Sequence, residues 1–139
     1  MKHQAILNYA SRLREAGNAF IVGELEKAGL KDIAPSHGIV LHLLFEAGEL
    51  NMSELAVQAR RTKSTLTTLV TKLERHGYVE RIPDPEDSRG VRVRLTDKGK
   101  ALEPAFLAIS DGLQNIILSR LTTQEADELE RLLAKCVES

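Results

Sequence analysis

The sequence contains few of the residues on which disulfide-rich or membrane proteins depend. It has a single cysteine among 139 residues, no tryptophan, 4% aromatic residues, four prolines and nine glycines. One cysteine excludes an internal disulfide framework and a cysteine-based zinc ribbon, and favours a reducing compartment, so we expect the cytoplasm. His42 interrupts the apolar run around Leu43, and Glu46 follows it. The length of this run is far below the ~18 apolar residues that a membrane helix needs. Neither membrane contact nor an export signal is therefore expected.

The remaining composition is that of one folded domain with an uneven charge distribution. Hydrophobic residues make up 42% and charged residues 28% of the chain, and the net charge is -1. The length allows one domain with its own core and excludes a tandem of two. Residues 60–100 hold 11 Lys and Arg against 6 Asp and Glu, whereas both flanks are acidic. Such a basic segment is expected where a phosphate backbone docks, although a solvated basic face would show the same pattern.

Helical periodicity dominates the first half of the chain. Apolar residues recur at three- and four-residue spacing over residues 6–20 and predict a long first helix, with Gly29 ending that region. A second helix is predicted after Pro35, with Ser36 as its N-cap and Gly48 at its end. The residues it should bury are Val40, Leu43, Leu44 and Ala47.

Two local capping patterns predict the next two helices. Asn51 followed by Glu54 resembles a capping box and should begin a short helix over residues 52–59. Thr62 can cap a fourth helix that closes at Gly77. The expected inward residues of this helix are Leu66, Leu69, Val70 and Leu73. The expected outward residues are Lys63, Ser64, Thr67, Thr68 and Thr71.

The hydrophobic period then changes from helical to alternating. Residues 78–82 and 91–95 are rich in strand formers, and the second run alternates apolar and basic side chains. The polar residues 83–90 between them predict a hairpin with a polar tip. Thr96 should cap a long helix, in which Pro104 marks either a kink or a delayed start. The segment 122–125 should open a last helix.

Two short helices followed by a two-stranded hairpin are typical of a winged helix-turn-helix. In that arrangement the second helix enters the major groove of DNA and the hairpin reaches the adjacent minor groove. We therefore predict a mainly α protein with a two-stranded wing, in which residues 36–98 form the DNA-binding part. Residues 1–30 and 99–139 would form flanking dimerisation helices.

The same segments resemble the MarR family of bacterial transcriptional regulators over essentially the whole chain. The matching residues are Ser53-Glu54-Leu55-Ala56, Thr62-Lys63-Ser64-Thr65-Leu66-Thr67, Leu73-Glu74-Arg75-His76-Gly77-Tyr78-Val79-Glu80-Arg81, Asp84, Asp87 and Arg89 in the wing, and Val93-Arg94-Leu95-Thr96-Asp97-Lys98-Gly99. The resemblance implies a homodimer in which the first helix and the last two interlock. Each subunit would then offer its winged part to one half of a palindromic operator.

The chain departs from the family pattern at three positions. The turn before the fourth helix usually has a glycine and an apolar residue, where this chain has Arg60 and Arg61. Arg60 is therefore expected in a left-handed conformation, and the two arginines could also grip phosphate, which would offset the cost of that conformation. Many relatives have arginine where this chain has Thr68. We therefore expect weaker base recognition than in a relative with arginine at this position, with contacts mainly to thymine methyl groups and phosphates.

The leading hypothesis is a repressor of double-stranded DNA targets that a small-molecule effector releases. The residues expected to face the major groove are Lys63, Ser64, Thr67 and Thr68. Those expected to hold phosphates are Thr62, Arg75, Arg92 and Arg94. Arg89 would enter the minor groove, held extended by a carboxylate of Asp84 or Asp87, whereas a merely loop-stiffening ion pair is the alternative.

The other constellations carry weaker expectations. His37 stands near a cleft that such dimers form and could contact a small aromatic acid effector, although a histidine on a mostly apolar helix is more often a satisfied core or rim residue. The histidines and Cys136 lack ligand spacing, so no metal or cofactor is expected. No nucleophile with its base is recognisable, so an enzyme is not expected. A winged-helix module that contacts proteins without specific DNA binding remains the alternative function.

Overall fold

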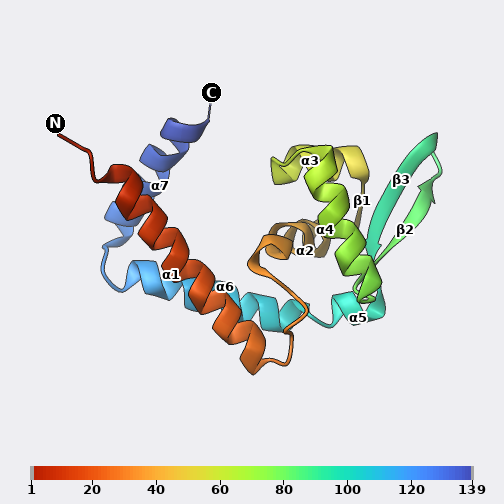
Figure 1. The fold of residues 1–139 in the computed structure, drawn as a ribbon, viewed down its shortest axis with the longest axis horizontal. Helices are drawn as coiled ribbons and strands as arrows, with labels where there is room; N and C mark the ends of the chain where they lie inside the picture. Colours follow the sequence, from red (N-terminus) through yellow and green to blue (C-terminus); the bar gives the residue numbers. More distant parts are fainter. Residues whose placement is uncertain (1, 139) are drawn as a thin grey trace. The chain divides into compact units, whose positions relative to one another are not determined.

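The computed structural model describes residues 2–138 and consists mainly of helices with one small sheet (Figure 1). In chain order the elements are α1 (Ile6–Lys27), the 3-10 turn η1 (Pro35–His37), α2 (Gly38–Ala47), β1 (Glu49–Asn51), α3 (Met52–Ala59), α4 (Lys63–Arg75), β2 (Val79–Asp84), β3 (Asp87–Leu95), α5 (Asp97–Lys100), α6 (Glu103–Leu118) and α7 (Thr123–Val137). None of the helices within the described range is long and apolar enough to cross a membrane.

The chain divides into two compact units. Of the described residues, one unit comprises residues 25–106, and the other joins residues 2–24 to residues 107–138. The first unit contains η1, α2 to α5 and the whole sheet, so the helix-helix-hairpin order expected for residues 36–98 lies entirely within it.

The core of the 25–106 unit is built from the inward faces of α2, α3 and α4, from the strand residues Val79 and Val93, and from Leu25 near the end of α1. Its fully buried side chains include Leu25, Leu41, Leu44, Leu55, Leu66 and Leu73. The predicted inward positions of α4 are confirmed, with Leu69 only half-buried. In α2 the prediction was right for Val40 and Leu44 and wrong for Ala47, which is exposed. Leu43 is half-buried, and Leu41 takes the place in the core instead.

Side-chain caps form at the starts of α3, α4 and α7, where the local sequence predicted them. Asn51 Oδ1 accepts from the Glu54 N–H at 2.7 Å, which is one half of the expected capping box, and Thr62 Oγ1 accepts from the Thr65 N–H at 3.1 Å. At the start of α7, Thr122 and Glu125 complete a reciprocal capping box. These bonds satisfy backbone donors that the first helical turn leaves unpaired.

The start of α2 differs from the prediction. Ser36 lies inside η1 and does not cap α2, so this N-cap prediction was wrong. Instead, Nδ1 of the buried His37 accepts a hydrogen bond from the Ala34 N–H at 3.0 Å. A side chain from the end of the turn thus closes the turn that leads into α2.

The sheet has three strands rather than the expected two. Its order is β1-β3-β2, and both pairings are antiparallel. The three residues of β1 place Leu50 opposite Val93, which is fully buried. The predicted eight-residue tip is also too long, because Asp84 already pairs with Asp87 and only two residues turn the chain.

The chain leaves the wing through a short helix rather than a long one. Thr96 caps α5, which spans only four residues, and α6 starts afresh at Glu103. Pro104 therefore marks a delayed start, in the first turn where its missing N–H is not needed. Gly99 permits the close packing here, because a Cβ added to it would lie 2.0 Å from the Tyr78 carbonyl oxygen.

The unit formed by α1, α6 and α7 has a different character. Gly112 of α6 packs so closely on α1 that an added Cβ would lie 2.7 Å from the Phe20 ring. Yet no side chain among residues 2–24 and 107–138 is buried. Large apolar side chains such as Leu7 (81% exposed) and Val137 (80% exposed) face solvent.

Candidate nucleic-acid interface

The outward face of α4 carries the polar side chains that the sequence placed there. Lys63, Ser64, Thr67 and Thr68 are all exposed, while Leu66 and Val70 on the opposite face are fully buried. The hairpin β2-β3 extends beside this helix in the same unit (Figure 1). The arrangement presents one polar helical face together with the hairpin tip.

Arg81 on β2 joins the hairpin to α4, a role that the sequence reasoning missed. Its Nη2 donates to Thr71 Oγ1 at 2.6 Å and to the Thr67 carbonyl oxygen at 3.3 Å. Its Nη1 lies 3.6 Å from Glu74 Oε1, and the other carboxylate oxygen accepts from the Arg81 N–H. The buried Nε has no hydrogen-bond partner among the described residues. The signal for this residue was its place at the end of the Leu73–Arg81 motif.

A cleft of about 460 Å³ lies between α4, the start of α3 and the hairpin. Its lining residues are Asn51, Met52, Ser53, Lys63, Thr67, Arg81, Asp84, Asp87, Arg89, Gly90 and Val91. The structure thereby brings Lys63 and Thr67 together with the three wing residues singled out from the sequence. Arg75, Arg92 and Arg94 do not line this cleft.

The two wing aspartates hold the backbone of the turn rather than the Arg89 side chain. Asp84, only 8% exposed, accepts from the Glu86 N–H at 3.0 Å, and Asp87 accepts from the Arg89 N–H at 3.0 Å. Within residues 2–138 the Arg89 guanidinium forms no ion pair, so the expected carboxylate pairing is not what fixes it. A Cβ on Gly90 would lie 3.2 Å from Asp84, which explains the glycine at this tight turn.

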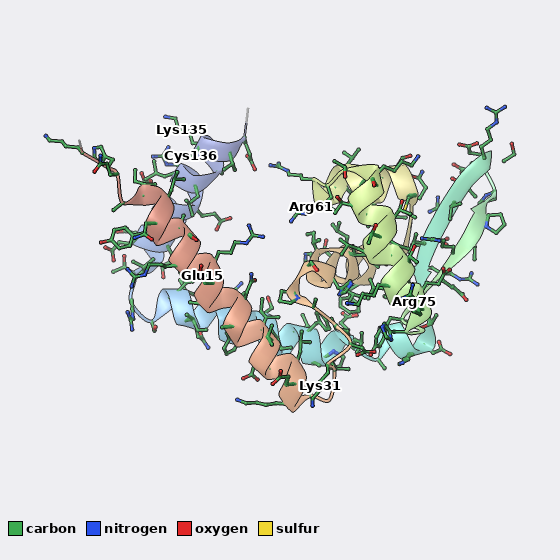
Figure 2. All side chains as sticks on the ribbon, in the orientation of Figure 1. Glu15, Lys31, Arg61, Arg75, Lys135 and Cys136 are labelled. Atoms are coloured by element: carbon green, nitrogen blue, oxygen red, sulfur yellow. The ribbon has the colours of Figure 1, made fainter. Side chains whose placement is uncertain are left out.

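The expected phosphate-binding residues differ in how free their side chains are. Arg92 lies 3.8 Å from Glu49, and Arg94 lies 2.5 Å from Glu80, so both charges are partly neutralised on the sheet. Thr62 uses its hydroxyl to cap α4 and to reach Thr65 at 2.9 Å. Arg75, the last residue of α4, is exposed (Figure 2) and has no partner within the described range.

The turn between α3 and α4 shows the expected backbone conformation. Arg60 has φ 54° and ψ 46°, in the left-handed region that usually costs a residue with a side chain roughly 1 kcal/mol. Arg61 Nη1 donates to the Ala59 and Arg60 carbonyl oxygens at 3.3 Å and 3.1 Å. These bonds satisfy the carbonyls at the end of α3, so Arg61 closes this turn.

A second polar cluster ties the loop before α2 to the far end of α4. The Tyr78 hydroxyl donates to Asp32, whose two carboxylate oxygens both lie at 3.0 Å, and His76 Nδ1 lies 3.5 Å from the same carboxylate. Burial and the Asp32 hydrogen bond raise the pKa of Tyr78 to about 12. The Lys98 ammonium lies 4.5 Å from the centre of the Tyr78 ring. The cluster fastens the loop before α2 to the turn after α4 and includes none of the outward residues of α4.

His37 does not occupy the position expected of an effector ligand. Its side chain is 1% exposed, and burial lowers its pKa, so the neutral ring is favoured. The ring's Nε2 is buried without a partner among the described residues. A direct contact with a dissolved effector does not fit this burial. Elsewhere in residues 2–138 no group of three or more metal-ligating side chains comes together.

Comparison with known proteins identifies relatives of the same architecture. The model of the MarR family matches residues 33–91. The transcriptional repressor YetL of Bacillus subtilis is 33% identical over 101 residues, which cover 71% of this chain and 60% of YetL. Alignments with other curated relatives likewise span only 54%, 40% and 66% of their lengths.

Solved structures extend the likeness to nearly the whole chain. A mutant MarR of Escherichia coli in complex with operator DNA is 27% identical, with a TM-score of 0.84 over 96% of this chain and 94% of that one. NadR in complex with 4-hydroxyphenylacetate is 29% identical, with a TM-score of 0.74 over 99% of this chain and 96% of that one. The predicted mainly α winged-helix fold is thus confirmed.

Proposed function

Because the chain belongs to the MarR family of transcriptional regulators, we propose that it is a homodimeric repressor of a pseudo-palindromic operator, released by a small-molecule effector. The observation that carries the proposal is the shared cleft in which Lys63 and Thr67 of α4 meet Arg89 of the hairpin tip. One face of the 25–106 unit thus offers both a helix for the major groove and a cation for the minor groove. Such a repressor would act in the cytoplasm.

We assign the DNA contacts according to the freedom of each side chain. Lys63, Ser64, Thr67 and Thr68 would face the major groove, and Arg89 the minor groove. Arg75 is the least constrained cation for phosphate. Arg92 and Arg94 would have to exchange Glu49 and Glu80 for phosphate oxygens. Thr62 would contact phosphate through backbone groups at the start of α4, since its side chain caps the helix.

The dimer is supported by the unburied apolar side chains of α1, α6 and α7. A unit with no buried side chain gains little from folding alone, so a second copy is the simplest cover. Two winged parts on one duplex face predict half-site centres about 34 Å apart.

The effector class is supported by one relative. NadR has been solved with 4-hydroxyphenylacetate, a small aromatic acid. We propose an effector of this class, which would oppose DNA binding through one coupling free energy of about 1 to 3 kcal/mol. A panel of aromatic acids that changes neither DNA affinity nor thermal stability would contradict this part of the proposal.

Selection of duplexes from a random pool by the full-length protein tests the function directly. We expect enrichment of an inverted repeat, with an affinity that falls steeply as salt rises, because phosphate contacts release counterions. Enrichment of a single asymmetric site would exclude the palindromic dimer. Absence of any enriched duplex would favour the alternative, a winged-helix module for protein contacts.

A further inference from the structure

The second turn of α4 uses its hydroxyl hydrogens within the helix. Thr67 Oγ1 donates to the Lys63 carbonyl oxygen at 2.7 Å, and Thr68 Oγ1 donates to the Ser64 carbonyl oxygen at 3.2 Å. A hydroxyl has a single hydrogen, so neither threonine has a second one to offer. Each bond also selects the rotamer that holds Oγ1 against the preceding turn. Each exposed side chain therefore offers a methyl group and oxygen lone pairs.

The neighbouring positions of the same face differ from this pair. The Lys63 ammonium and the Ser64 hydroxyl make no hydrogen bond within the described part of the chain, so both remain donors. Thr71, one turn beyond Thr67, is half-buried and accepts from Arg81. The polar face is thus divided into a donor-bearing first turn and a second turn of methyl groups and acceptors.

We propose that Thr67 and Thr68 make the second turn of α4 a reader of A·T pairs. In the major groove an A·T pair presents the thymine C5-methyl group and the adenine N6 amino donor, whereas a G·C pair presents two guanine acceptors, N7 and O6, and the cytosine N4 amino donor. The threonine methyl group matches thymine alone, the oxygen lone pair can then accept from the adenine of the same pair, and guanine would need a donor that this turn has already used. Any guanine contact of α4 belongs to Lys63 or Ser64. This inference rests on the proposed DNA-binding function and specifies its base preference.

The test uses the full-length protein and the duplex that it enriches from a random pool. Deoxyuridine in place of single thymines removes only the C5-methyl group, and 7-deazaguanine in place of single guanines removes only N7. We expect deoxyuridine at one or two thymines within each half-site to weaken binding about fourfold, the value of one buried methyl group. Replacing guanines should matter only at positions that depend on Lys63 or Ser64.

Two variants of Thr67 separate its methyl group from its oxygen. Thr67→Ser keeps the hydroxyl and should abolish the deoxyuridine effect at the thymine that it contacts. Thr67→Val keeps a methyl group and should retain that effect while losing preference for adenine over purine, which lacks the amino group. Ser64→Ala is the matched control and should leave the deoxyuridine effect unchanged. Circular dichroism of each variant checks that the helix is intact.

Three outcomes have distinct meanings. A deoxyuridine effect that disappears in Thr67→Ser or Thr68→Ser but persists in Ser64→Ala supports the inference. A 7-deazaguanine effect that disappears in Thr67→Val or Thr68→Val overturns it, as does a duplex indifferent to deoxyuridine, while the DNA-binding function stands. Failure to enrich any duplex overturns the proposed function and this inference with it.

Discussion

The two units of the chain differ in how many of their side chains are buried. Every buried side chain among residues 2–138 lies in the 25–106 unit, where polar groups are also tied by Arg81 and by the Tyr78–Asp32 hydrogen bond. Residues 2–24 and 107–138 of the other unit include no buried side chain, and the ion pair between Glu128 and Arg131 there is exposed. One unit has its own core, whereas the apolar side chains of the other lack cover. The difference supports the proposal that DNA reading and dimer assembly are carried by separate parts.

Separating the units should give the largest effect. A fragment of residues 25–106 should fold cooperatively as a monomer, while the full-length chain should sediment as a dimer. The fragment should bind the enriched duplex about 100-fold more weakly, because it loses the gain from engaging two half-sites at once. Sedimentation equilibrium and fluorescence anisotropy measure the two effects. A dimeric fragment would contradict this prediction, because it would show that the 25–106 unit itself forms the dimer contact.

A pair of matched arginines tests the difference in internal bonding. Arg81→Ala should lower the free energy of unfolding by about 1 to 3 kcal/mol, because hydrogen bonds from a charged group to Thr71, Thr67 and Glu74 are lost. Arg131→Ala removes an exposed ion pair with Glu128 at 2.6 Å and should change stability too little to measure. Urea titration of both variants compares them. An equal loss of unfolding free energy in both variants would show that side-chain bonds stabilise the two units to the same extent.

The tip of the hairpin should affect binding without affecting folding. Arg89→Ala should weaken duplex binding by about 1 to 3 kcal/mol, most where A·T-rich flanks narrow the minor groove, and should leave the melting temperature unchanged. A lower melting temperature with full duplex affinity in Arg89→Ala would show that the hairpin tip has a structural role.

Lys63→Ala should weaken binding to all DNA sequences similarly if Lys63 holds phosphate. It should then also lower the slope of binding affinity against salt concentration by about one unit.

The smallest expected effect is a pH dependence confined to the 25–106 unit. The pKa of Tyr78 is raised from 10.0 to about 12 in the folded chain. The contribution of Tyr78 to the free energy of unfolding is therefore complete below pH 10 and is lost as pH rises towards 12. The unfolding free energy should therefore fall more steeply across this window in the parent than in Tyr78→Phe. Parallel curves of unfolding free energy against pH for the two proteins would show that the Asp32 hydrogen bond does not shift the pKa of the Tyr78 hydroxyl.

The sequence predicted those features that depend on residues close together in the chain. The caps at Asn51, Thr62 and Thr122 each involve a bond across three positions, so a local pattern is sufficient. The strand β1 has three residues and exists only through pairing with β3, more than forty positions later, so no local period reveals it. Ser36 had a capping side chain in the right place, but the turn at η1 was closed by His37 instead.

The candidate site shows the same limit. The outward positions of α4 follow from helical period alone, whereas Arg81 reaches them across the turn at Gly77 and needed the fold to be seen. For the wing, the contacts of Asp84 and Asp87 differ from those that the sequence predicted. Asp84 and Asp87 accept from backbone N–H groups, because the turn is only two residues long and brings those groups within reach.

The close approach at Gly99 has a consequence for anyone who maps this protein by genetics. No Cβ fits there without moving the Tyr78 carbonyl, and Thr96 bridges the same point by donating to the Gly77 carbonyl and accepting from the Gly99 N–H. In a genetic screen for loss of the proposed repression, alleles would therefore accumulate at residue 99, which does not line the proposed DNA cleft. A screen that scored only the phenotype would assign that glycine to recognition, although its defect would lie in the joint where the wing ends.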